Sequence, residues 1–207
     1  VLVSLNGEEG RQKDVFRKMM RFTAFITFPL LFGFGLVAKE FIVTAIGEKW
    51  LASAQLIQIL CLSGATMPLS TLFSNMIISK GRSGTFFWCT FTLGLVQIAT
   101  MIMIWPMGIR TMVIAYTLLN TSWLLVWLFF VRRLIGYGHW MFFCDVMPVA
   151  LAAAGVMGVA YVATMPLSNL IALLISRFII AVVLYYAVMK IARVKILAEC
   201  ERFVKRG

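Results

Sequence analysis

The sequence is poor in charge. Asp, Glu, Lys and Arg make up 13% of its 207 residues, and only eight of them are acidic. A soluble globular domain carries about 25% charged and about 45–50% apolar residues, whereas 62% of this chain is hydrophobic. The shortage of charge excludes a water-soluble domain and predicts a protein embedded in a lipid bilayer.

Histidine and clustered cysteine are also scarce. The chain has one histidine, His139, and four cysteines that lie far apart, Cys61, Cys89, Cys144 and Cys200. Zinc sites and disulfide frameworks need closely spaced cysteines or several histidines. We therefore expect no metal and no cofactor.

Catalysis finds no support among the remaining polar residues. Gly33 and Gly35 lie inside an apolar run with no strand before them, so they do not form a phosphate-binding loop. Asp145 begins a later apolar run near Arg132 and Arg133, and we expect a structural ion pair there. The sequence predicts a protein that is not an enzyme.

The excess of positive charge does not indicate nucleic acid. The formal net charge is +11. Proteins that bind nucleic acid gather basic residues on one solvated face, whereas here they are confined to short gaps between apolar runs. We exclude nucleic acid as a partner.

Six apolar runs follow one another, separated by charged or turn residues. At about 1.5 Å per residue, each is long enough to cross roughly 30 Å of hydrocarbon. The runs are 22–43, 51–79, 84–105, 111–131, 140–165 and 167–189. They predict an all-α membrane protein with six transmembrane helices.

The basic residues between the runs predict the orientation. Fifteen of the nineteen Lys and Arg fall on the side of the N-terminus and three on the opposite side. Because cytoplasmic loops are enriched in these residues, both ends of the chain are expected in the cytoplasm. We divide the chain into a basic cytoplasmic link (1–21), a six-helix transmembrane domain (22–189) and a basic cytoplasmic tail (190–207).

Arg177 is the sharpest candidate for a functional residue. It lies near the middle of the last run, where an arginine facing lipid costs at least ~2.5 kcal/mol. We expect it to face a water-filled cavity, a carboxylate or an anionic substrate, or to hydrogen-bond backbone carbonyls. Lys39 and Glu40 near the end of the first run are further candidates, although adjacent residues point about 100° apart on a helix.

Uncharged polar residues at membrane depth complete the substrate-pathway candidates. They are Asn75 and Asn120, with Gln97 as a third polar residue, and each also suits interhelical hydrogen bonding. Lys80 and Arg82 end the second run, where they could meet a phosphate or simply mark the cytoplasmic side.

Four stretches resemble a known family. They are VSLNGEEGRQKDVFRKMMR (3–21), FPLLFGFGLVAKEFIVTAIGEKW (28–50), LIQILCLSGATMPLSTLFSNMIISKGRS (56–83) and PMGIRTMVIAYTLLN (106–120). These stretches resemble those of the polysaccharide flippases of the multidrug/oligosaccharidyl-lipid/polysaccharide exporter superfamily. The shared features are a basic link, a helix that contains a proline, a Gly-x-x-Trp ending and a Gly-Arg turn. The O-antigen and capsule exporters of lipopolysaccharide biosynthesis are the nearest group.

The resemblance implies a flippase that moves a polyprenyl-pyrophosphate-linked oligosaccharide across the bacterial inner membrane by alternating access. The six helices would form most of its C-terminal lobe, with an N-terminal lobe and a glycan polymerase as further partners. A cation such as Arg177 would bind the pyrophosphate. The chain has no initiator methionine, and we expect it to be the C-terminal part of a longer protein.

Two other functions stay open at this point. One is a cation-coupled multidrug exporter of the same superfamily, for which Glu40 is the only near-membrane glutamate of the first run. The other is a non-transporting membrane subunit of a glycan-assembly complex.

Overall fold

The six apolar runs are six helices in the computed structural model, which describes residues 9–165 and 170–191. The helices are α1 (Glu9–Ala45), α2 (Leu51–Ser79), α3 (Ser83–Ile104), α4 (Ile109–Ile135), α5 (His139–Ala163) and α6 (Leu170–Ile191). Short 3₁₀ turns at Glu48–Trp50 and Trp105–Met107 precede α2 and α4. The described residues contain no strand, and all six helices are long and apolar enough to cross a membrane. The predicted fold class is confirmed.

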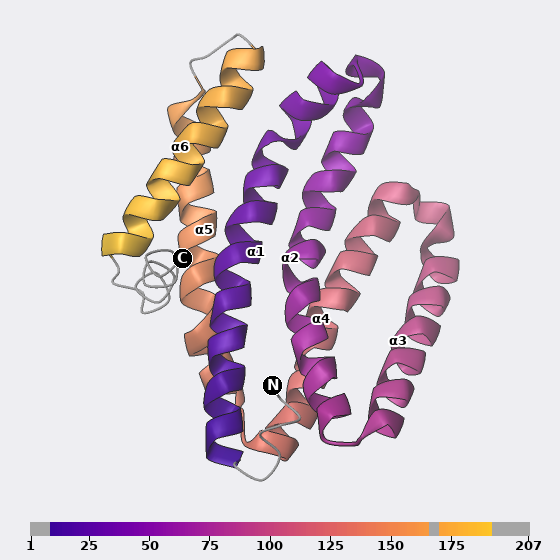
Figure 1. The fold of residues 1–207 in the computed structure, drawn as a ribbon. Helices are drawn as coiled ribbons and strands as arrows, with labels where there is room; N and C mark the ends of the chain where they lie inside the picture. The colour runs from indigo at the N-terminus through magenta and orange to yellow at the C-terminus, as the bar shows by residue number, and fades with distance from the viewer. Residues whose placement is uncertain (1–8, 166–169, 192–207) are drawn as a thin grey trace.

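Helix α1 lies at the centre of the arrangement. Figure 1 shows α5 and α6 on one side of it and α2, α4 and α3 on the other. α1 packs against α2, α5 and α6, and α2 packs in turn against α4. α3 contacts only α2 and α4 substantially and buries a single residue, Cys89. The chain therefore leaves most of α3 facing outward, as suits a helix in contact with lipid.

The basic segment before the first apolar run is part of α1. The helix continues from Glu9 through residue 21 into the apolar run, without a break. Its buried positions recur every four residues, at Gln12, Phe16, Met20, Ala24 and Phe28, which is the spacing of one helix face. The structure shows no boundary at residue 22, and a cytoplasmic location for this segment stays a prediction.

The apolar core gathers at the end of the molecule where α1 begins. Phe16, fully buried, lies with its ring centroid 5.3 Å from that of Tyr137 and 5.7 Å from that of Phe73. The core continues through the end of α2, the end of α4 and the start of α5. Four of the described helices are thus joined at this end, and the positions of their basic residues are fixed there.

Two tight turns lie at the same end as the start of α1 in Figure 1. The turn between α2 and α3 contains Lys80, Gly81 and Arg82, and Gly81 has φ +73°. The turn between α4 and α5 begins at Gly136, which has φ +66° and donates its N–H to the carbonyl of Arg132 at 3.0 Å. Only glycine adopts these backbone angles at little cost. The two turns therefore place Lys80 and Arg82, together with Arg132 and Arg133 of the last turn of α4, at one end of the bundle.

Candidate functional site: a buried ion pair between α1 and α6

Arg177 and Glu40 form an ion pair in the interior. Nη1 of Arg177 lies 2.7 Å from Oε1 of Glu40. The two residues are only 6% and 5% exposed. Both were candidates from sequence, and the structure brings them together. The pair joins α6 to α1, so the charge of Arg177 is already neutralised by a carboxylate of the same chain.

Other contacts fix the orientation of the guanidinium. Its Nε donates to Oγ1 of Thr164 at 3.1 Å, and Nη1 donates to the carbonyl of Leu36 at 3.4 Å. The guanidinium carbon also lies 5.0 Å from the ring centroid of Tyr161, a distance at which the ring face attracts a cation. Arg177 is therefore held by α1 and by the end of α5 as well as by Glu40.

The carboxylate of Glu40 is only half satisfied. Oε2 is buried and accepts no hydrogen bond from any described residue. A buried carboxylate oxygen without a partner is costly. Glu40 is thus the less well satisfied member of the pair.

An apolar groove runs between α1 and α6 and reaches this pair. Its volume is about 610 Å³, and Arg177 is its one charged lining residue. Because α1 and α6 run in opposite directions, one end of the groove lies near Val37 and Arg177 and the other near Phe25 and Tyr185. The remaining lining residues are Ile26, Pro29, Leu30, Gly33, Phe34, Met157, Phe178, Ala181, Val182 and Tyr186.

A proline in α1 explains one polar contact in the groove wall. Pro29 has no N–H, so it cannot bond to the carbonyl of Phe25 four residues earlier. The hydroxyl of Tyr185 on α6 donates to that carbonyl at 3.0 Å instead. This is how a proline can be accommodated in a membrane helix, where no water replaces the lost bond. The contact also ties α6 to α1 at the far end of the groove.

A second charged cluster lies around Asp145 near the start of α5. Arg17 of α1 donates to both of its oxygens, from Nε at 2.9 Å and Nη2 at 3.0 Å. Nε of Arg21 lies 3.6 Å from Oδ1, and the Tyr137 hydroxyl donates to Oδ2 at 3.2 Å. Burial, and secondarily the charge of Asp145, raises the pKa of Tyr137, so its phenol stays protonated and donates.

The ion-pair partners predicted for Asp145 were wrong. Arg132 and Arg133 are close in sequence, but the guanidinium of Arg133 lies 4.4 Å over the ring of Phe129. The bidentate partner is Arg17, from a segment expected to be a separate link. The spacing of Arg17 and Arg21, four residues apart on one helix face, was the signal that could have indicated a shared partner.

The other sequence candidates lie apart from the ion pair. Lys39 is exposed beside the buried Glu40, in keeping with their different directions on the helix, and Asn75 is exposed on α2. Asn120 donates to the carbonyl of Tyr116 at 2.9 Å and lines a small cavity of about 100 Å³ with hydroxyl residues of α2. Lys80 and Arg82 flank the turn between α2 and α3. None of these residues contacts Arg177 through an interaction recorded in the described part of the chain.

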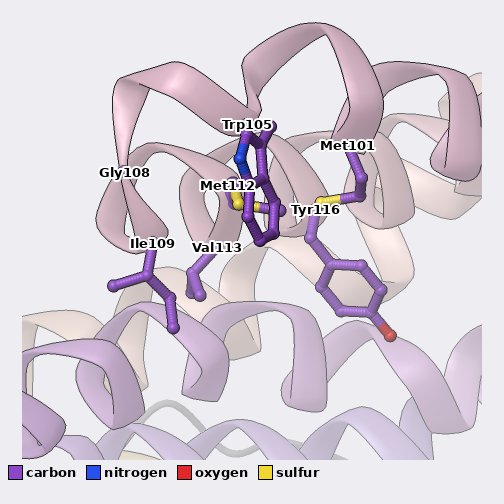
Figure 2. Close-up of a pocket in the computed structure, with 7 residues that line it drawn as sticks. All are labelled: Met101, Trp105, Gly108, Ile109, Met112, Val113 and Tyr116. Carbon is purple, nitrogen blue, oxygen red and sulfur yellow. The ribbon is translucent and has the colours of Figure 1, made fainter.

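A pocket at the turn between α3 and α4 offers no charged group. Figure 2 shows its lining, which is Met101, Trp105, Gly108, Ile109, Met112, Val113 and Tyr116. Trp105 is 74% exposed, and tryptophan at a helix end is typical of the membrane interface. We read this pocket as part of the surface that contacts lipid.

Comparisons with known proteins support the resemblance seen in the sequence. The family described as "Polysaccharide biosynthesis protein" matches residues 1–55, which include Arg17, Arg21 and Glu40. Over these residues the chain is similar to proteins of polysaccharide biosynthesis. The match ends shortly after the start of α2.

Two proteins are similar to part of this chain. An uncharacterized membrane protein in the cps region of Klebsiella pneumoniae is 28% identical over 81 residues, which cover 39% of this chain and 17% of the relative. The teichuronic acid biosynthesis protein TuaB of Bacillus subtilis (strain 168) is 32% identical over 77 residues, which cover 37% and 16%. The chain thus matches about a sixth of each relative's length. No solved structure matches the chain.

Proposed function

We propose that the protein takes part in moving a lipid-linked oligosaccharide from the inner to the outer leaflet of the bacterial inner membrane by alternating access. The observation that carries the proposal is the buried pair of Arg177 and Glu40, which lies between membrane helices and borders an apolar groove. Charged groups at membrane depth are rare, and they mark substrate and ion pathways. The matches to polysaccharide biosynthesis proteins support the class of cargo.

The pair suits a substrate that carries pyrophosphate. Arg177 is neutralised by Glu40 while the site is empty, so no bare cation lies in the membrane. A phosphate oxygen entering beside it would replace the carboxylate as its partner, and charge-assisted bonds between arginine and phosphate are strong at low dielectric. Glu40, whose Oε2 has no partner among the described residues, is the member more readily displaced. Binding would then release a contact between α1 and α6, which couples occupancy to helix movement.

A second candidate function is cation-coupled export of another compound. The buried, half-satisfied carboxylate of Glu40 favours it, because such an oxygen can accept a proton or a cation. Substrate identity separates the two candidates. A drug exporter would change the susceptibility of cells to toxic cations, and a glycan flippase would change surface polysaccharide.

The experiment replaces the chromosomal gene by variants and measures surface polysaccharide together with the level of protein in the membrane. Arg177→Ala is expected to reduce surface polysaccharide at least tenfold, because a lost charge-assisted bond is worth about 1.5–3 kcal/mol. Lys39→Ala, an exposed cation one residue from Glu40, is the matched control and should have no effect.

Loss of stability must be separated from loss of transport. The double variant Glu40→Gln/Arg177→Gln removes both charges and leaves no uncompensated ion in the interior. It is expected to insert normally and still fail to export. Normal export by this double variant would remove the ion pair from the mechanism.

A further inference from the structure

The groove between α1 and α6 has cations at the end opposite to Arg177. Its lining begins on α1 at Phe25, and Arg21 precedes Phe25 by one helical turn on the same face. On α6 the lining ends at Tyr186, and Nζ of Lys190 lies 5.9 Å from the centroid of the Tyr186 ring. Basic side chains therefore flank this end of the groove from both of its walls.

Among the described residues, the cations at this end outnumber the carboxylates that contact them. Arg17 and Arg21 share the single carboxylate of Asp145, which also accepts the hydroxyl of Tyr137. Asp145 is 3% exposed, whereas each arginine side chain is about 30% exposed (31% and 29%). Asp14 lies on an exposed face of α1, and its charge makes a small contribution to the stabilisation of Arg17. In the described part of the chain, Lys190 has no carboxylate partner and Arg21 has only the longer contact with Asp145, at 3.6 Å, so both can attract an anion.

The length of the groove matches one leaflet. From Phe25 to Val37 there are 12 residues, which rise about 18 Å at 1.5 Å each, and half of the hydrocarbon core is about 15 Å thick. The lining over this length is apolar except for Arg177 at its inner end. A transmembrane helix of a partner would extend across both leaflets, whereas a single acyl chain needs only this depth.

We propose that this groove is the binding site of an anionic glycerophospholipid. The phosphodiester lies between Arg21 and Lys190, and an acyl chain occupies the groove along Pro29 and Gly33 toward Met157. The negative charge of the phosphodiester is opposite in sign to Arg21 and Lys190, which flank this end of the groove. Binding of a phospholipid in this groove does not depend on which compound the protein transports.

The test measures lipid retained by the full-length protein in nanodiscs made of equal parts phosphatidylglycerol and phosphatidylcholine. After transfer to mild detergent, native mass spectrometry counts the bound lipids of each kind. The wild type is expected to retain phosphatidylglycerol at least tenfold over phosphatidylcholine. Both lipids carry an ionised phosphodiester, but the choline cation cancels its charge in phosphatidylcholine and is repelled by Arg21 and Lys190. Equal retention of the two lipids would overturn the proposal.

Two pairs of variants test the two parts of the site. Arg21→Gln/Lys190→Gln leaves the bidentate bond of Arg17 to Asp145 intact and should lower phosphatidylglycerol retention about tenfold, and Lys39→Gln at the other end of α1 should not. Leu30→Trp changes a groove residue that is 62% exposed and should block the acyl chain of the lipid from the groove. Leu95→Trp, on the exposed face of α3, should leave lipid retention unchanged. Retention that is the same in each variant and its control contradicts the assignment.

A third arm separates the two possible sources of the phosphate. Polyprenyl monophosphate is added to the loaded nanodiscs as a competitor. Phosphatidylglycerol that persists at equal concentrations of the two lipids supports a phospholipid site. Its complete displacement would assign the groove to a transport substrate and overturn the proposal.

Discussion

Oε1 of Glu40 lies 2.7 Å from Nη1 of Arg177, and these two residues are the buried charges that α1 and α6 bring together in the described interior. Each residue neutralises the charge of the other and so lowers the cost of burying it. An isolated arginine or glutamate at this depth would cost several kcal/mol, whereas the pair also gains bonds from Arg177 to Thr164 and Leu36.

Breaking the pair from one side is expected to destabilise the protein strongly. Glu40→Gln or Arg177→Gln leaves one buried charge without its counter-ion, at a cost of about 3–5 kcal/mol. The measurement is thermal unfolding in a fixed detergent, followed by circular dichroism.

Removing both charges should restore most of that stability. The double variant Glu40→Leu/Arg177→Met replaces the pair by apolar side chains, and such replacements of buried pairs are often neutral or stabilising. If the losses of stability measured for the two single variants instead add up in the double variant, the two residues do not act as a pair. Lys39→Gln, which is exposed, should stay within about 0.5 kcal/mol of the wild type.

The hydrogen bond from Tyr185 to Phe25 should matter only because Pro29 is present. Tyr185→Phe leaves the Phe25 carbonyl without its donor, at an expected cost of about 1 kcal/mol. In a Pro29→Ala background the alanine N–H supplies the helical bond, and the same Tyr185→Phe change should cost close to nothing. Equal costs in the two backgrounds would show that the hydroxyl does not replace the bond that the proline lacks.

Asp145 should be more important for stability than Arg132 or Arg133, which lie in the last turn of α4. Asp145→Asn leaves Arg17 and Arg21 without a carboxylate, with an expected loss of about 1–3 kcal/mol, toward the lower value because both side chains are partly exposed to screening. Arg132→Gln serves as the control, since the bidentate partner of Asp145 is Arg17. A larger loss for Arg132→Gln than for Arg17→Gln would contradict the observed pairing.

The helices themselves were readily predicted from the sequence. The second run was expected at 51–79, and α2 spans Leu51–Ser79. The reason is physical: an apolar run in lipid must satisfy its backbone internally, so its length alone indicates a helix. α1 begins earlier than its apolar run because Phe16 and Met20 continue the buried face into the basic segment, and hydropathy does not detect this periodicity.

The partners of the charged residues could not be predicted in the same way. The cost of burial singled out Arg177, but that cost is met equally by a carboxylate, a carbonyl or a ligand. The structure contains the first two, in Glu40 and Leu36. The choice between Lys39 and Glu40 depended on the rotation of α1 about its axis, which its contacts with α5 and α6 determine. Asp145 was assigned to neighbours in sequence because contacts between distant helices are not visible in local patterns.

The orientation of the bundle is open to a labelling experiment. Gly47 and Gly81 have positive φ angles, so cysteines are better placed at the exposed neighbours Glu48 and Ser83. In a background without native cysteines, an impermeant thiol reagent added to intact cells is expected to label Glu48→Cys and not Ser83→Cys, because basic residues predict a cytoplasmic location for the turn between α2 and α3. The reverse pattern would invert the assigned orientation.

The leaflet that holds the lipid-linked oligosaccharide is the most direct measure of whether the Glu40–Arg177 pair takes part in transport. It is measured by digestion with a glycosidase added outside spheroplasts, in cells that carry the wild-type gene or Glu40→Gln/Arg177→Gln at equal protein levels. We expect the wild type to expose the glycan to the enzyme and the variant to leave it protected in the inner leaflet. Equal digestion in both strains would contradict a role for this ion pair in transport.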